Sequence, residues 1–151
     1  MPTLTANQIS VRRLSEEDRP LLEQMYDTFT PLGEALGLPP RDAARRSAWL
    51  DHLWTGINVV AVIEGRVAGH LALMPSGQAA EMALFVHQDF RRQGVGAALF
   101  PAAAEEARAR GLRHLWVLVS NDNFPARAGL RRFGFRPAWE DLGEVQMILP
   151  L

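Results

Sequence analysis

Arginine and glycine are the residue types that point to a chemistry in this chain, because they occur together in the segment Arg91-Arg92-Gln93-Gly94-Val95-Gly96. The apolar run from Glu81 to Val86 predicts a strand before it, and the alanine-rich stretch from Val95 to Arg110 predicts a helix after it. A glycine loop between a strand and a helix directs unpaired backbone N–H groups and the helix dipole at one point. The glycines let the backbone approach a ligand, and the arginines add positive charge. The segment therefore predicts a phosphate-binding loop.

On this segment alone, a turn that only joins a strand to a helix remains an equal alternative. Two better-known phosphate loops do not fit. A dinucleotide fingerprint needs a third small residue where Leu99 stands, and an acidic residue after the next strand, where Ser120 and Asn121 stand. A P-loop needs a lysine, whereas all 16 basic residues of this chain are arginine. The loop thus indicates a phosphate group without naming the molecule that carries it.

A second pattern lies one predicted strand further on, where Asn123 and Ala126 open a segment that ends in Gly134-Phe135. With the glycine loop, it resembles the two signatures of the GNAT superfamily of N-acetyltransferases: Arg/Gln-x-x-Gly-x-Gly/Ala, then Asn-x-x-Ala followed by a helix and Gly-Phe. The two signatures stand in register, and the resemblance covers residues 59–135. Ala80-Glu81, Asn123-x-Pro125 and the ending Arg131 to Phe135 are loosely similar to the bacterial protein-lysine acetyltransferase type.

The resemblance implies an α/β fold of the GNAT type, with four helices. Its central sheet would be mixed and mostly antiparallel, with about seven strands splayed between strands 4 and 5. Acetyl-CoA would be the cosubstrate, with its pantetheine arm paired to the backbone of Ala83 to Val86 and its pyrophosphate on the N–H groups of Gln93 to Ala98. The residues that it assigns to coenzyme A binding are Leu84, Phe85, Val86, Arg91, Arg92, Gln93, Gly94, Val95, Gly96, Ala97, Asn123 and Ala126.

The reaction implied by the resemblance is transfer of an acetyl group to a primary amine, of a small molecule or of a protein lysine or N-terminus, by direct attack on the thioester. A backbone N–H near Phe85 or Val86 would stabilise the oxyanion. Glu81, expected to begin the strand that carries the thioester, is our choice of general base. An ordinary glutamate is far weaker than an amine as a base, so this role requires Glu81 to be buried. His87 is the second choice, although we expect it to be a solvated loop histidine.

Leu130 stands where many members of the family have a tyrosine that protonates the leaving thiolate. We therefore expect no tyrosine general acid, and a non-catalytic acyl-CoA sensor is the alternative function. The only tyrosine, Tyr26, lies on the expected buried face of the first helix, which favours a packing role. A third alternative is an interaction domain that uses its four tryptophans as anchors, although core packing explains them more simply.

Hydrophobic periodicity and turn residues divide the whole chain into elements that would position these residues. The predicted strands are 9–14, 59–63, 67–74, 81–86, 115–119, 135–139 and 145–149, and the predicted helices are 16–29, 41–55, 95–110 and 124–133.

Length and composition limit the remaining possibilities. With 151 residues, we expect one domain over residues 1–151. The net charge of -1 indicates no nucleic-acid partner.

No apolar run approaches the ~20 residues of a membrane span, and the first residues do not resemble a secretion signal, so we expect no membrane contact and a cytoplasmic location. The absence of cysteine excludes thiolate sites, and we expect no metal. The last strand, 145–149, could pair with another subunit in a homodimer.

Overall fold

The computed structural model describes residues 8–33 and 37–151, which form seven strands and four α-helices. The strands are β1 (Ser10–Arg13), β2 (Ile57–Ile63), β3 (Arg66–Ser76), β4 (Ala79–Val86), β5 (His114–Ser120), β6 (Arg136–Glu140) and β7 (Glu144–Pro150). The α-helices are α1 (Arg19–Asp27), α2 (Ala43–Trp54), α3 (Val95–Ala109) and α4 (Phe124–Phe133), and the 3-10 helices are η2 (Glu16–Asp18) and η3 (Gln88–Phe90). This order of strands and α-helices is the predicted one.

Proline explains why the first predicted helix is divided. η2 ends at Asp18, and α1 begins at Arg19 with Pro20 in its first turn. Because Pro20 has no N–H, it cannot donate the α-helical bond to the carbonyl of Glu16, so the α-helix starts after that position. The turn η3, which lies between β4 and the glycine loop, was not predicted.

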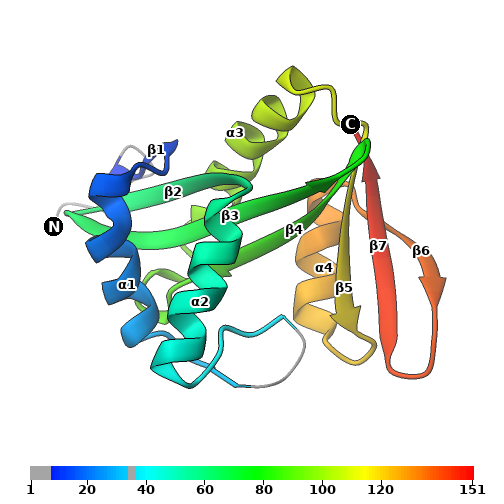
Figure 1. The fold of residues 1–151 in the computed structure, drawn as a ribbon. Coiled ribbons are helices and arrows are strands. Elements are labelled where there is room, and N and C mark those ends of the chain that lie inside the picture. Colours follow the sequence, from blue (N-terminus) through cyan, green and yellow to red (C-terminus); the bar gives the residue numbers. More distant parts are fainter. Residues whose placement is uncertain (1–7, 34–36) are drawn as a thin grey trace, which may run out of the picture.

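The seven strands form one sheet in the order β1-β2-β3-β4-β5-β7-β6. β4 and β5 are parallel, and every other neighbouring pair is antiparallel. β4 pairs with β5 only from Ala79 to Glu81, opposite His114 to Trp116, and the two strands then separate (Figure 1). The predicted mixed sheet, splayed between strands 4 and 5, is confirmed.

The position of β7 contradicts the prediction that this strand could pair with another subunit. β7 lies inside the sheet, between β5 and β6, so its backbone groups are bonded on both sides. The outer strands are β1 and β6, and all five residues of β6 are exposed. The prediction was wrong because the apolar pattern of β7 reports burial and does not reveal which neighbours bury it. A homodimer itself stays a prediction.

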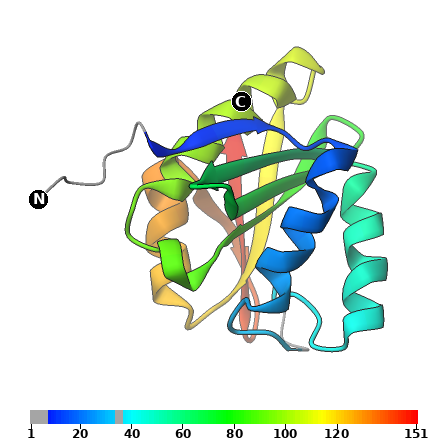
Figure 2. The same ribbon diagram turned by 90° about the vertical axis from the view of Figure 1, so that its left-hand side faces the viewer.

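The helices cover the two faces of the sheet, with α3 and α4 on one side and α1 and α2 on the other (Figures 1 and 2). The core beneath α3 includes Leu71, Leu99 and Leu115, all fully buried. The core beneath α1 and α2 includes Leu22, Tyr26 and Leu50. No helix within residues 8–33 and 37–151 combines the length and apolar character needed to cross a membrane.

Gly69 on β3 sets how closely α3 approaches the sheet. A Cβ at this position would lie 2.6 Å from Val95 Cγ1 and 3.0 Å from Leu99 Cδ1. A real Cβ essentially never makes a contact of 2.6 Å, so a larger residue here would force Val95 in the first turn of α3 to shift. The start of α3 is thereby fixed beside the end of β4.

Candidate functional site

The separation of β4 from β5 opens a groove of about 680 Å³. Glu81, the last β4 residue paired with β5, stands where the groove begins. Beyond it, β4 keeps its bonds to β3, but its other edge faces the groove. The groove is lined by Phe29, Pro31, Gly37, Leu38, Glu81, Met82, Ala83, Leu84, Phe85, Val86, Arg91, Val117, Leu118, Val119, Ser120, Asn123, Pro125, Ala126, Gly129, Leu130 and Phe133.

Strand alternation directs successive β4 side chains to opposite sides of the sheet. Met82 and Leu84 join the core on the α3 side of the sheet. Ala83 and Phe85 join the core on the α1 side, and alternation places Glu81 on that side with them. A ligand held by α3 could therefore reach through the groove to a second molecule that enters past Glu81.

The glycine loop is the exposed N-terminus of a 15-residue helix. Gly94 is the N-cap with φ 82°, a left-handed conformation that suits glycine, and Arg92 also has a positive φ of 63°. The first N–H groups of α3, those of Val95, Gly96 and Ala97, have no acceptor inside the helix. A Cβ at Gly96 would lie 3.6 Å from Leu84 Cδ2, an ordinary contact, so the protein's own packing does not require glycine there. Space for a ligand beside the helix N-terminus would account for a glycine at position 96.

Arg91 lines the groove, but its guanidinium binds backbone carbonyls. Nε donates to the carbonyl of Val86 at 2.9 Å, and Nη2 donates to the carbonyl of Thr30 at 2.7 Å. The group also lies over the ring of Phe29, 5.5 Å from its centroid. Arg91 thus joins the end of β4 to the segment after α1. Arg92 and Gln93 are exposed at the loop itself.

Gln88, which precedes the glycine loop, holds the same segment after α1. The side chain of Gln88 donates to the carbonyl of Thr28 at 2.6 Å and accepts the N–H of Thr30 at 3.1 Å. We call the set Gln88, His87 and Arg91, with the bonds that they make to residues 28–30, the clasp. Because Phe29 and Pro31 line the groove, the clasp sets the position of one of its walls.

His87 is buried, with 1% of its surface exposed, so the expectation of a solvated histidine was wrong. Its Nδ1 accepts the N–H of Asp89 at 3.1 Å, which leaves the proton on Nε2, and Nε2 donates to Thr28 Oγ1 at 2.8 Å. Burial, the largest cause, lowers the pKa of His87. Since Nδ1 already accepts a hydrogen bond, His87 has no lone pair directed at a substrate. The geometry therefore does not support His87 as a general base. No local pattern could have revealed this, because Thr28 is 59 residues away.

Glu81 is at the groove, as its predicted role requires, but it is exposed. It is also the third residue of β4, because the strand begins at Ala79. The burial on which the general-base prediction depended is therefore absent. The side chain of Glu81 is exposed at the point where β4 and β5 begin to separate.

Asn123 begins α4 across the groove. Its side-chain oxygen accepts the N–H of Ala126 at 3.3 Å and so caps the helix. Leu130, the residue in place of the expected tyrosine, is 8% exposed and forms part of the groove wall. Leu84, Phe85 and Val86 lie opposite, on β4. The structure thus brings the predicted cofactor residues of β4 and α4 to one groove.

Comparison with known proteins agrees with this geometry. The sequence profile described as "Acetyltransferase (GNAT) family" matches residues 21–135. The chain belongs to the GNAT acetyltransferase family. The predicted family is confirmed.

The individual proteins to which this GNAT protein is similar carry different names. Mycothiol acetyltransferase of Clavibacter michiganensis subsp. michiganensis is 40% identical over 80 residues, which are 52% of this chain and 26% of the relative. The match thus spans about a quarter of that relative's length. A ribosomal-protein-alanine N-acetyltransferase from Brucella melitensis has a TM-score of 0.76 at 24% identity, over 94% of this chain and 99% of that one. The protein yncA from Salmonella typhimurium, solved with its cofactor acetyl-CoA, has a TM-score of 0.75 at 19% identity, over 96% and 95% of the two chains. These two structures show the GNAT fold.

Tyr26 of this GNAT protein belongs to a buried polar chain that the sequence did not predict. Asn58 donates from Nδ2 to the carbonyl of Leu53, so its Oδ1 accepts from His70 Nε2 at 2.7 Å. His70 Nδ1 then accepts the hydroxyl proton of Tyr26 at 2.7 Å. Burial lowers the pKa of His70 to about 3 and raises that of Tyr26. Tyr26 is 1% exposed, which confirms its packing role.

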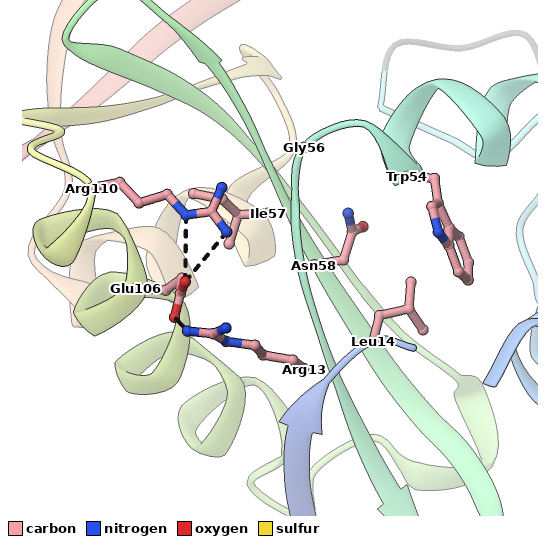
Figure 3. A pocket seen from close by; sticks show the side chains of 8 residues that line it. All are labelled: Arg13, Leu14, Trp54, Gly56, Ile57, Asn58, Glu106 and Arg110. Carbon is pink, nitrogen blue, oxygen red and sulfur yellow. Dashed lines mark hydrogen bonds and ion pairs between the residues drawn. The ribbon is translucent and has the colours of Figure 1, made fainter. Parts of the chain in front are cut away.

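A second cavity, of about 110 Å³, lies away from the groove, between β1, the end of α2 and the end of α3 (Figure 3). Glu106 binds both Arg13, at 2.5 Å, and Arg110, at 3.3 Å. One carboxylate shared by two arginines ties the outer strand β1 to α3, which is a structural role. Among the described residues, no group of three or more His, Cys, Asp or Glu side chains is placed to hold a metal ion.

Proposed function

We propose that this protein is an acetyl-CoA-dependent N-acetyltransferase that acts on a primary amine. The observation that carries the proposal is that the free edge of β4 leads from Glu81, at the start of the groove, toward the exposed N-terminus of α3, where a Cβ at Gly96 would lie 3.6 Å from Leu84 and 3.7 Å from Phe133 of the groove. A reacting thioester, an amide-containing arm and a diphosphate would find matching partners in that order along this path.

The donor would be held mainly by backbone groups. The pyrophosphate would accept bonds from the N–H groups of Gln93 to Ala97, where the helix dipole also favours negative charge. The amides of the pantetheine arm would pair with the free backbone edge of Ala83 to Val86, as a strand pairs with its neighbour. Such bonds satisfy β4 groups that β5 leaves unpaired.

The acceptor would enter on the Glu81 side of the groove. Its nitrogen loses a proton and attacks the thioester carbonyl, the carbon–sulfur bond breaks, and coenzyme A leaves as a thiolate. Glu81 would take the proton, since it is the carboxylate at the point where β4 and β5 separate. Bound donor and acceptor would displace the water that surrounds Glu81 in the free protein. A backbone N–H at Phe85 or Val86 would stabilise the oxyanion.

Departure of the thiolate would proceed without a tyrosine general acid. Leu130 has no proton to give, and the hydroxyl of Tyr26 donates to His70. A thiol with a pKa of about 8.5 is a tolerable leaving group without protonation. A general acid typically contributes roughly 10²–10⁴-fold, so we expect slower transfer than with one, and not its absence.

The proposed reaction fits more than one class of acceptor. The named relatives act on different molecules, and a small amine, a protein lysine and a protein N-terminus all carry the nucleophile that this reaction needs. The subgroup that acts on protein lysines is the one to which the sequence is loosely similar.

Release of free thiol from acetyl-CoA, followed in the presence of a panel of amines and peptides, tests the proposal. We expect Glu81→Gln to lower the rate about 10²-fold or more while the dissociation constant for acetyl-CoA changes less than about threefold. Glu105→Gln, on an exposed position of α3, is the matched control and should keep the full rate. Equal loss of rate and of acetyl-CoA binding in Glu81→Gln would refute the assignment of the base.

A non-catalytic acyl-CoA sensor is the second candidate, favoured by Leu130. It predicts tight binding of coenzyme A, no turnover on any amine of the panel, and no gain of activity in Leu130→Tyr. Turnover that rises in Leu130→Tyr would instead show that the site is a working enzyme that lacks its acid.

A further inference from the structure

The side chain of Arg91, the first arginine of the glycine loop, is held by the protein itself. Its guanidinium donates to the carbonyl of Val86 at 2.9 Å and to the carbonyl of Thr30 at 2.7 Å. A guanidinium that turned toward a phosphate would have to give up these bonds. Arg92, the next residue, is exposed at the loop and has a positive φ of 63°. The two arginines of the loop therefore lie in different environments.

The guanidinium of Arg91 also lies apart from the start of α3. It lies over the ring of Phe29, 5.5 Å from the centroid, and Phe29 belongs to the core on the α1 side of the sheet. Val95, the first residue of α3, belongs to the core on the other side. The N–H groups that would bind a diphosphate are at that helix start. The charge of Arg91 is therefore directed to the side of the groove on which Glu81 lies.

The bond to Val86 anchors Arg91 to the free edge of β4. Val86 pairs with Gly69, and the N–H of His87 donates to the carbonyl of Ala68. In an antiparallel pair, this pattern directs the backbone groups of Val86 away from β3 and toward the groove. The carbonyl of Val86 is the acceptor for Nε of Arg91. One end of the guanidinium is thereby fixed to the sheet.

The bond to Thr30 connects the other end of the guanidinium to a wall of the groove. Thr30 lies between Phe29 and Pro31, and both of these residues line the groove. The N–H of Thr30 donates to the side chain of Gln88 at 3.1 Å, and its carbonyl accepts from Arg91. Both backbone groups of Thr30 are thus held by residues that follow β4. Loss of Arg91 would let this wall move.

We propose that Arg91 is a positioning residue that holds the wall of Phe29 and Pro31 for the acceptor, and that it is not a ligand of the diphosphate. The inference rests on the proposed function, because it takes an amine as the molecule that enters past Glu81. The ring of Phe29 packs against Phe85, with 6.0 Å between centroids, and Phe85 shares the side of β4 on which Glu81 lies. The wall is therefore continuous with the surface along which the acceptor enters.

The same substitution at adjacent positions separates the roles of the two arginines. Arg91→Gln and Arg92→Gln remove the same charge, and glutamine is too short to bond both carbonyls that Arg91 holds. Coenzyme A would be titrated into each protein by calorimetry. Arg91→Gln should leave the dissociation constant within about threefold. Loss of an arginine that binds phosphate weakens binding about tenfold or more, and Arg92→Gln should show the larger effect.

Thiol release from acetyl-CoA measures the acceptor side, with phenethylamine, a lysine-containing peptide and the rest of the panel as acceptor probes. Arg91→Gln should raise the KM for the acceptor about tenfold while kcat changes less than about threefold, because the wall contributes to binding. Gln88→Ala removes the other bond to Thr30 from outside the glycine loop and should raise the same KM. The control is Arg108→Gln, at an exposed position of α3 outside the groove, which should change neither constant.

Hydrogen exchange of the Thr30 N–H connects these constants to the bond itself. Arg91→Gln should speed this exchange about tenfold, and Arg92→Gln should leave it unchanged. Because Arg91 and Arg92 are both exposed, we expect both variants to fold, and thermal unfolding checks this before the constants are compared.

Three results would overturn the inference and leave the proposed function standing. Weakening of coenzyme A about tenfold or more in Arg91→Gln, at least as large as in Arg92→Gln, would make Arg91 a phosphate ligand. Unchanged exchange of the Thr30 N–H in Arg91→Gln would show that the guanidinium does not hold the wall. Faster exchange with an unchanged acceptor KM would show that the acceptor does not use the wall. Failure of coenzyme A to bind, or no thiol release with any acceptor, would instead refute the proposed function and this inference with it.

Discussion

Replacing Gly69 by alanine tests how the phosphate loop is held in place. The new Cβ would lie 2.6 Å from Val95 Cγ1, 3.0 Å from Leu99 Cδ1 and 3.2 Å from the carbonyl oxygen of Phe85. Since ordinary contacts begin near 3.4 Å, the side chains of Val95 and Leu99 must shift, and we expect the start of α3 to move away from β3 with them. Val95 is the first residue of α3, so the N–H groups of the loop would move with it.

The magnitude follows from the cost of inserting a methyl group into a packed core. Overpacking of this kind costs about 1–3 kcal/mol. For a chain of this size, each kcal/mol lowers the melting temperature by about 2–4 °C, so we expect a fall of about 4–8 °C for a cost near the middle of that range. Displacement of the loop should also weaken acetyl-CoA binding about tenfold.

A double-mutant cycle separates this mechanism from general damage. Val95→Ala removes the methyl groups that the new Cβ would meet, so Gly69→Ala should destabilise the Val95→Ala protein less than the unmodified one. Unfolding in urea gives the free energies, and titration with acetyl-CoA gives the affinities. If the two changes add without coupling, or if Gly69→Ala leaves the melting temperature unchanged, the reasoning from Gly69 is wrong.

Two further predictions concern the clasp and the buried histidine. Gln88→Ala removes two hydrogen bonds to the segment after α1, so it should speed hydrogen exchange of the Thr30 N–H about tenfold. The control Gln24→Ala, at an exposed position, should leave this exchange rate unchanged. An unchanged rate in Gln88→Ala would show that the clasp does not hold this segment. His70 has a folded pKa of about 3 against an unfolded value of about 6.5, so the unfolded state binds the extra proton between these values. Stability should therefore be complete above pH 6.5 and be lost, by a few kcal/mol, as the pH falls toward 3. Unfolding in urea from pH 7 to pH 4 should show a steeper loss for the unmodified protein than for His70→Gln, and equal slopes would contradict the assignment.

Local patterns were enough to predict the elements and the glycine loop. Short apolar runs identified β2, β3 and β4, and the alanine-rich stretch identified α3, because each signal lies within a few neighbouring residues. The spacing from Arg91 to Asn123 added the family, and with it the mixed sheet and the splay between β4 and β5. The predicted cofactor residues of β4 and α4 line the groove that this splay opens.

What the sequence did not reveal depends on contacts between distant segments. Buried His87 bonds to Thr28, 59 residues earlier, and exposed Glu81 lies where β5 and β4 begin to separate. The hydrogen bond between Tyr26 and His70 spans 44 residues, and neither residue belongs to a recognisable motif. The expectation that β7 could pair with another subunit was wrong because the apolar pattern of this strand reports burial without identifying its neighbours, which are β5 and β6.

The central claim is that acetyl-CoA binds along the path from the N-terminus of α3 to the groove, and amide chemical shifts measured during a titration test it most directly. The account predicts saturable shifts, largest for the N–H groups of Gln93 to Ala97 and of Leu84 to Val86. Absence of shifts, or shifts confined to Arg13, Glu106 and Arg110 around the second cavity, would contradict it.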